Sequence, residues 1–214
     1  MEKQEIRTFG RRHGKSLSAR QQWLVENILP AISPKNIKNT GKIVLEIGFG
    51  AGEHLRDIAI ASPDDIIIGA EPFMNGVASL MSAITDESDN SIKPEYKNIR
   101  IWPDDVRQLL QLHIAPGTLD MVYILHPDPW PKARHQKRRL LNANFLNLLT
   151  MYIKPDGKII IGTDHHEYYD WIVEQLKNTK LKINTTDLKI IKTRYQQKNK
   201  AGTIAPKYLV LESR

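Results

Sequence analysis

The chain contains no cysteine, no apolar stretch of bilayer-spanning length and no apolar signal region at its start. The missing cysteine excludes a disulfide framework and thiolate chemistry. The missing apolar stretches argue against a transmembrane helix and a secretory signal peptide. The 214 residues are 41% hydrophobic and 26% charged, as in ordinary globular domains. The sequence therefore predicts a cytoplasmic globular protein that is not embedded in a membrane.

Positive charge is in excess, with a formal net charge of +7 and a sequence pI of about 9.5. Such a balance is typical of domains that bind nucleic acid. A single basic cluster is compatible with an ordinary solvated surface, but several clusters together predict a phosphate-binding surface. The clusters are Arg7, Arg11, Arg12, Lys15 and Arg20; Lys132, Arg134, Lys137, Arg138 and Arg139; and Lys189, Lys192, Arg194, Lys198 and Lys200.

Short β-rich runs alternate with helical patterns along most of the chain. The pattern predicts a single α/β domain over residues 16–214, with a mostly parallel sheet and helices on both faces. Residues 1–15 are polar and rich in arginine, and we expect a basic, flexible N-terminal arm there. The predicted strands are Ile43–Ile47, Ile66–Ala70, Ile99–Trp102, Met121–Leu125, Lys158–Gly162, and a terminal hairpin of Leu188–Arg194 and Tyr208–Leu211. The predicted helices are Ser16–Leu29, Glu53–Ile60, Phe73–Ile84, Asp105–Leu112, Gln136–Ile153 and His166–Asn178.

A glycine-rich segment joins the first predicted strand to the following helix. Gly48, Gly50 and Gly52 form a G-x-G-x-G pattern, which lets the backbone approach a ligand closely. A dinucleotide fingerprint requires a third glycine one position later, where this chain has Glu53. A carboxylate at that helix N-terminus would repel a pyrophosphate. The segment therefore argues against a nicotinamide or flavin cofactor.

Acidic residues accompany this glycine segment. Glu46 lies at the end of the first strand, two residues before Gly48. Glu71 follows the second strand, at roughly the spacing of 20 residues along the chain at which an acid contacts ribose hydroxyls. A ligand with a ribose, a cationic part and no phosphate suits such a pocket, and S-adenosylmethionine is one. Asp104 and Asp105 follow the third strand; either could accept from an adenine amine, or Asp104 could cap the helix. We favour Asp105 as the ligand contact.

The strand Met121–Leu125 runs into the sequence His-Pro-Asp-Pro-Trp-Pro-Lys, which ends at Lys132. Its prolines stop the strand and leave a stiff loop. Loops at the carboxyl ends of strands in α/β sheets commonly carry catalytic residues. The loop presents Asp128, Trp130 and Lys132. Trp130 could either stack on an unpaired base or pack the loop against the core.

These motifs together resemble the bacterial tRNA (guanine-N7)-methyltransferase family over nearly the whole chain. The Pro-Asp-Pro-Trp loop with its basic continuation is the most specific part of the resemblance. The other matching segments are Phe9–Arg12 with Gln21, the Glu46 glycine loop, Glu71, Asp105, Gly162–Asp164 and Thr193–Tyr195. The resemblance implies a class I methyltransferase domain with a seven-stranded sheet, and methylation of N7 of a guanosine in the tRNA variable loop.

The resemblance also implies roles for individual residues. The cofactor S-adenosylmethionine would be bound by the glycine loop (Gly48, Gly50, Gly52) and by Glu46, Glu71, Asp105 and Asp128. Asp128 is the implied catalytic residue. The implied tRNA-binding residues are Lys132, Asp164, Thr193, Arg194, Tyr195 and Gln196. Two positions depart from the family pattern, which commonly has glutamate at Gln196 and phenylalanine at His126.

The sequence predicts no metal site, because its histidines lack the spacing of metal ligands. It gives no indication of an obligatory protein partner. Two alternatives to tRNA methylation stay open. One is an S-adenosylmethionine-dependent enzyme acting on another RNA, a protein or a small molecule. The other is a noncatalytic RNA-binding protein on the same scaffold.

Overall fold

The structure, a computed structural model, describes residues 9–10, 12–35, 37, 41–184 and 206–213. Its strands are β1 Ile43–Ile47, β2 Ile66–Ala70, β3 Ile99–Trp102, β4 Leu119–Leu125, β5 Ile153–Thr163, β6 Leu181–Asn184 and β7 Lys207–Ser213. Its α-helices are α1 Ala19–Asn27, α2 Glu53–Ala61, α3 Met74–Ile84, α4 Val106–His113, α5 Ala143–Thr150 and α6 His166–Leu176. Short 3₁₀ helices are η1 Leu29–Ile32, η2 Pro94–Tyr96 and η3 Ala133–Arg138.

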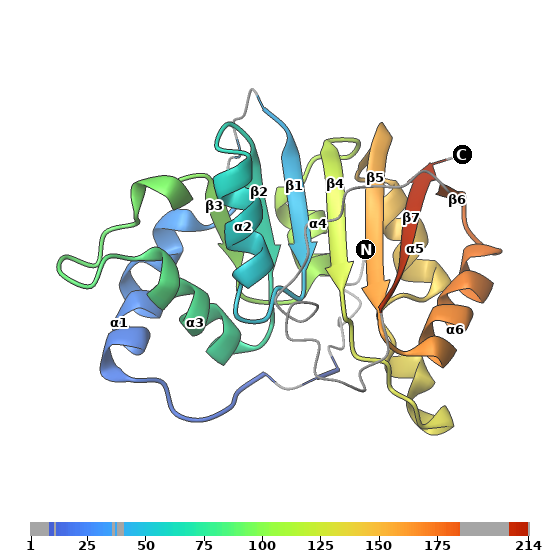
Figure 1. Ribbon diagram of the computed structural model, residues 1–214, viewed down its shortest axis with the longest axis horizontal. Helices are drawn as coiled ribbons and strands as arrows, with labels where there is room; N and C mark the ends of the chain where they lie inside the picture. Colours follow the sequence, from blue (N-terminus) through green and yellow to red (C-terminus); the bar gives the residue numbers. More distant parts are fainter. Residues whose placement is uncertain (1–8, 11, 36, 38–40, 185–205, 214) are drawn as a thin grey trace. The chain divides into compact units, whose positions relative to one another are not determined.

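The strands form a seven-stranded sheet in the order β3-β2-β1-β4-β5-β7-β6 (Figure 1). Strands β2 and β3 pair in parallel, as do β4 and β5. Strand β7 is antiparallel to both β5 and β6. The predicted mostly parallel sheet with a C-terminal antiparallel hairpin is confirmed. The predicted hairpin strand Leu188–Arg194 lies outside the described residues, and the strand described beside β7 is β6, which the sequence reading missed.

Contacts divide the chain into two compact units, Met1–Lys42 with Glu46–Ile114, and Ile43–Leu45 with Ala115–Arg214. In the first unit, β2 is buried along its whole length, as its isoleucine-rich sequence requires of a strand covered on both faces. Helix α1 begins at Ser18, whose side chain accepts from the backbone N–H of Gln21 while the Gln21 side chain accepts from that of Ser18. Such a reciprocal cap explains the start of the helix. Helix α1 packs against α3 in this unit (Figure 1).

In the second unit, the prediction of one helix over Gln136–Ile153 was wrong. The segment forms η3, then an extended residue at Arg139, and then α5. Two side chains cause the interruption. Arg139 is buried and turned away from the solvent, and Asn142 accepts from the backbone N–H of Phe145 as the N-cap of α5. A helix cannot run through a residue that caps the start of another helix.

The Asn142 cap makes a testable contribution to stability. Replacing Asn142 with alanine leaves the N–H of Phe145 without its acceptor. We expect a loss of about 1 kcal/mol in the free energy of unfolding, or about 2–4 °C in Tm. Thermal unfolding followed by circular dichroism measures this. Asn144→Ala, at an exposed position two residues further on, is the matched control, and equal shifts for the two variants would contradict the assignment of the cap.

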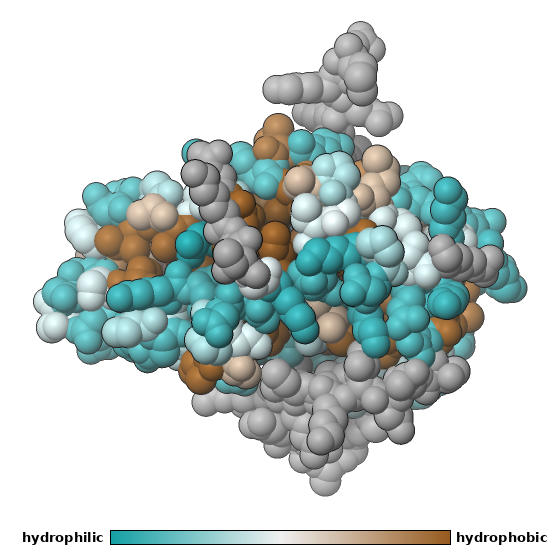
Figure 2. Space-filling view, turned by 90° about the horizontal axis from the view of Figure 1, so that it is seen from above, coloured by the Kyte–Doolittle hydropathy of each residue, from teal (hydrophilic) through white to brown (hydrophobic). Residues whose placement is uncertain are grey.

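The surface shown in Figure 2 is largely hydrophilic, with hydrophobic residues in smaller patches between the polar ones. Among the described residues, the large hydrophobic side chains that are exposed include Trp23 on α1 and Met151 after α5. Within the part of the chain that the structure describes, none of the helices has the length and apolar character needed to cross a bilayer.

Candidate active site

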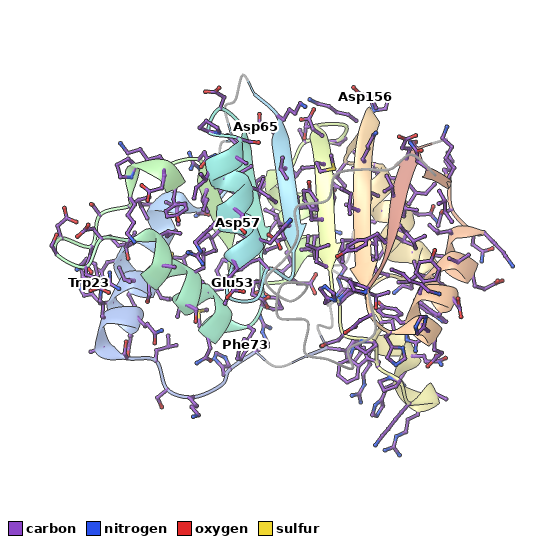
Figure 3. The ribbon with its side chains drawn as sticks, in the orientation of Figure 1. Trp23, Glu53, Asp57, Asp65, Phe73 and Asp156 are labelled. Carbon is purple, nitrogen blue, oxygen red and sulfur yellow. The ribbon has the colours of Figure 1, made fainter. Side chains whose placement is uncertain are left out.

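The glycine loop follows β1 in the first unit. Gly48 and Gly50 have positive φ angles of 75° and 58°, a region that side-chain-bearing residues seldom adopt. A Cβ at either position would meet none of the described residues within 4 Å, so the loop backbone is not covered by that part of the chain. Gly52 ends the loop as the N-cap of α2, and Glu53 lies in the first turn of that helix (Figure 3). The loop therefore offers bare backbone to a ligand.

Glu71 holds this loop in place. Its carboxylate accepts from the backbone N–H of Gly50 at 2.9 Å and from that of Phe73 at 2.8 Å. Gly76 on α3 allows the loop to come close, because a Cβ there would lie 2.4 Å from the carbonyl oxygen of Gly50. Glu71 is only 7% exposed. The acid that the sequence assigns to the ligand thus also fixes the backbone of the glycine loop.

Glu46 is the more deeply buried acid of the loop, at 3% exposure. Its Oε1 lies 3.2 Å from Nδ1 of His54, which is also buried in the first turn of α2. Its Oε2 is buried and has no hydrogen-bond partner among the described residues. A buried carboxylate oxygen without a partner costs free energy, and a donor group on a ligand would remove that cost. Sequence reasoning missed His54, although its place two residues after Gly52 was a usable signal.

The two acids after β3 have different surroundings. Asp105, not Asp104, is the N-cap of α4, and its carboxylate accepts from the backbone N, Nε and Nη2 of Arg107 at 2.7–2.9 Å. This hydrogen bonding raises the pKa of Arg107. Asp104 is half-buried, accepts from the N–H of Asp105 and pairs with the guanidinium of Arg12. Asp105 as an adenine contact stays a prediction, and its carboxylate already receives several donors from the protein.

Part of the N-terminal basic cluster is engaged within the first unit. The carbonyl oxygen of Arg12 accepts from the N–H of Met74, and Asn75 bonds to the backbone of both Gly14 and Lys15. Arg20 donates to Thr85, Asp86 and Asn90 at 3.0 Å in each case. The hydrogen bonds of Arg20 therefore stabilise the fold of the first unit. Residues 1–8 and Arg11 lie outside the described residues, and the flexible arm stays a prediction.

The proline loop follows β4 in the second unit. His126 and Trp130 have positive φ angles of 53° and 41°, a strained region for residues with side chains. The N–H of His126 donates to the carbonyl oxygen of Gly162 at 2.7 Å, which ties the start of the loop to β5. Asp128 is exposed, and no hydrogen bond or ion pair joins its carboxylate to another of the described side chains. The loop presents this carboxylate to solvent from a strained backbone.

His126 is half-buried, and its Nδ1 lies 4.0 Å from Oδ1 of Asp164 at the end of β5. Burial lowers the pKa of His126, while Asp164 acts in the opposite direction. The unfolded chain then binds a proton more readily than the folded one, so stability falls as the pH drops below about 6.5.

Replacing His126 with asparagine, which tolerates a positive φ, is expected to remove this contribution. Chemical denaturation between pH 7.5 and pH 5 measures the effect. The free energy of unfolding of the wild type is expected to fall more steeply toward low pH than that of His126→Asn. Parallel pH profiles for the two proteins would contradict the assignment.

The basic cluster after the loop divides into two groups. Lys132, Arg134 and Lys137 are exposed, as a phosphate-binding surface requires. Arg139 is 1% exposed, so the prediction that it belongs to this surface was wrong. Its guanidinium donates to the carbonyl oxygen of Pro129 at 2.7 Å and to Oε1 of Glu167 at 2.8 Å. Arg139 therefore supports the proline loop through a hydrogen bond to its backbone.

Trp130 packs within its own segment. The guanidinium of Arg138 lies 5.0 Å from the centre of its ring, and the His135 ring lies edge-on at 5.8 Å. Of the two roles that the sequence allowed, packing is the one that these contacts favour.

The predicted site residues are divided between the two units. The first unit holds Glu46, Glu71 and Asp105 with the three glycines, and the second holds Asp128, Lys132 and Asp164. The predicted substrate residues Thr193, Arg194, Tyr195 and Gln196 lie outside the described residues. Among the residues that the structure describes, no group of three histidines or acids could hold a metal ion.

The strand order with its C-terminal antiparallel hairpin, and the acidic glycine loop after β1, define the chain as a class I methyltransferase. A family model described as a putative methyltransferase matches residues 40–204. A tRNA (guanine-N(7)-)-methyltransferase of Sphingopyxis alaskensis is 43% identical over 171 residues, which cover 76% of this chain and 71% of the relative. One of Caulobacter vibrioides is 36% identical over 95% of this chain and 93% of its own. The chain belongs to the tRNA (guanine-N7)-methyltransferase family and is an enzyme of that class.

A solved structure, described as that of an antibiotic-related methyltransferase, is similar with a TM-score of 0.58. It covers 94% of this chain and 97% of its own, at 14% sequence identity. At this identity the similarity confirms the fold alone.

Proposed function

We propose that the protein transfers a methyl group from S-adenosylmethionine to N7 of the guanosine at position 46, in the variable loop of tRNA. The observation that carries the proposal is the likeness, over 95% of the chain, to a relative named as a tRNA (guanine-N(7)-)-methyltransferase. The exposed cations Lys132, Arg134 and Lys137 support a polyanionic substrate.

The residues of the glycine loop fit an adenosine-containing methyl donor. Among the described residues, none lies within 4 Å of a Cβ placed on Gly48 or Gly50, and none donates a hydrogen bond to the buried Oε2 of Glu46. We assign the binding of the donor to the glycine loop (Gly48, Gly50 and Gly52), to Glu46 and Glu71, and to Asp105. S-adenosylmethionine, when bound, supplies an electrophilic methyl group on a positively charged sulfur.

Guanine N7 carries an in-plane lone pair and no proton, so its methylation needs no general base. The enzyme has to align N7 with the methyl group and stabilise the positive charge that develops on the purine ring. We assign this task to the exposed carboxylate of Asp128, which can accept from the N1 and N2 donors of guanine. Asp164, at the end of β5, is assigned to the same base, and Lys132 to a phosphate. Thr193, Arg194, Tyr195 and Gln196 are further proposed tRNA contacts.

Labelled methyl donor with two tRNA transcripts tests the proposal. One transcript carries guanosine in the variable loop, and the other carries adenosine at that position. We expect label to enter the first transcript alone and to be recovered as 7-methylguanosine after digestion to nucleosides. Equal labelling of both transcripts, or of neither, would contradict the proposed substrate.

A further inference from the structure

Arg139 is buried in the second unit beneath the proline loop. It is 1% exposed, and its guanidinium lies 5.0 Å from the ring centres of both Tyr168 and Trp171 on α6. A charge removed from water requires partners. The guanidinium of Arg139 donates hydrogen bonds to the carbonyl oxygen of Pro129 at 2.7 Å, the carbonyl oxygen of Trp130 at 3.5 Å and the carboxylate of Glu167 at 2.8 Å.

Two of these partners are backbone carbonyls of the loop that carries Asp128. Pro127, Pro129 and Pro131 have no N–H, so most of the loop's backbone groups are acceptors. A segment with more acceptors than donors cannot satisfy all of its backbone carbonyls internally, so it needs hydrogen-bond donors from elsewhere in the protein. The planar guanidinium of Arg139 offers several donors in a fixed geometry, which suits two adjacent carbonyls.

The loop also stores strain that this support offsets. His126 and Trp130 have positive φ angles on either side of Asp128. Residues held in such conformations persist only where surrounding contacts determine them. Arg139 joins the carbonyls directly after Asp128 to Glu167 on α6, so the loop is anchored to a helix.

We propose that Arg139 is a positioning residue, which holds the Asp128 loop in its active conformation through the carbonyls of Pro129 and Trp130. The inference rests on the proposed function, because the active conformation is the one in which Asp128 meets guanine. Arg139 itself contacts neither substrate nor methyl donor. Its effect therefore falls on the rate of methyl transfer and not on the affinity for tRNA.

Arg139→Lys keeps the charge but loses the planar set of donors. We expect its single-turnover rate at saturating tRNA to fall about 100-fold, because a small misplacement of a catalytic group has that effect. Its tRNA affinity should stay within about twofold of the wild type, with an unchanged dependence on salt. A residue that binds phosphate behaves differently, since its loss weakens binding and lowers the salt slope by about one unit. Lys137→Ala, at an exposed position of η3, provides that comparison.

Glu167→Gln is the second variant, and it keeps the inference testable if Arg139→Lys does not fold. It weakens the anchor while Arg139 stays in place. We expect a smaller loss of rate, about tenfold, because it replaces a charged hydrogen bond by a neutral one. Glu174→Gln, on the same helix and paired with exposed Lys177, is the matched control and should keep the wild-type rate.

Hydrogen exchange of peptides covering residues 126–135 separates this inference from the proposed function, since it needs no activity. Faster exchange in Arg139→Lys and Glu167→Gln, but not in Glu174→Gln, supports the anchor. Wild-type rates and wild-type exchange in both variants would overturn it, as would a loss of tRNA affinity with an unchanged single-turnover rate. A wild type that does not methylate tRNA would refute the proposed function, while the exchange comparison would still decide the role of Arg139.

Discussion

Replacing Asp128 with alanine is expected to lower the single-turnover rate of methyl transfer about 100- to 1,000-fold at saturating tRNA. The physical reason is the charge that develops on guanine as N7 gains a methyl group. A carboxylate placed beforehand at the base stabilises that charge, and removal of one such group typically has an effect of this size. Asp128 is free for this role, because it is exposed and bonded to none of the other described side chains.

Quenched-flow measurement of labelled methyl transfer, with tRNA well above its dissociation constant, gives the rate. Asp128→Asn keeps an acceptor but loses the charge, and it should fall between the wild type and Asp128→Ala. Asp156→Ala removes an exposed carboxylate from β5 (Figure 3) and serves as the control with an unchanged rate. A near-normal rate for Asp128→Ala would remove this residue from the chemistry.

Replacing Glu46 with alanine is expected to weaken the binding of S-adenosylhomocysteine by roughly 10- to 100-fold. The carboxylate is buried, and none of the described residues donates a hydrogen bond to its Oε2. A hydrogen bond to a charged group contributes about 1.5–3 kcal/mol, which corresponds to this range of affinity. Isothermal titration calorimetry measures the dissociation constant.

The control for Glu46 is Asp57→Ala, which removes an exposed acid from α2 (Figure 3). Thermal unfolding of both variants is needed, because Glu46→Ala leaves His54 without its buried partner. An affinity equal to the wild type in folded Glu46→Ala would show that the donor binds elsewhere.

The sheet was predictable because its signals are local in the sequence. Isoleucine-rich runs such as Ile66–Ala70 are typical of strands buried on both faces, and glycines at positive φ follow β1 where the sequence placed them. Glu46 was found because it lies two residues before Gly48, and Glu71 because it follows the second strand at the spacing of an acid that contacts ribose hydroxyls. The identification of these acids depends only on their positions along the chain, which the sequence shows directly.

The support of the proline loop was not predictable in the same way. Arg139 stands in a run of basic residues and has the sequence context of a surface cation, yet it lies buried against Tyr168 and Trp171. Its role depends on the carbonyl oxygens of Pro129 and Trp130, ten and nine residues earlier in the chain, and on helix α6, which follows later. No local sequence pattern predicts such contacts. The same side chain and the Asn142 cap together interrupt the helix predicted over Gln136–Ile153.

The acids after β3 show a third case, in which both residues were identified but the helix cap was placed one residue too early. The sequence allowed Asp104 to cap the helix, whereas Asp105 does so. One residue of register decides between them, and helix starts are uncertain from sequence by more than that. The pairing of Asp105 with Arg107, and of Asp104 with Arg12, became visible only in the structure.

We expect this enzyme to methylate N7 of a guanosine in tRNA. A tRNA carrying 7-deazaguanosine in the variable loop tests it most directly, because this base replaces N7 by a C–H group and keeps the N1 and N2 donors. The modified tRNA should bind as the normal one does and accept no methyl label, while the guanosine tRNA should be labelled stoichiometrically. Equal labelling of the two tRNAs would contradict the account.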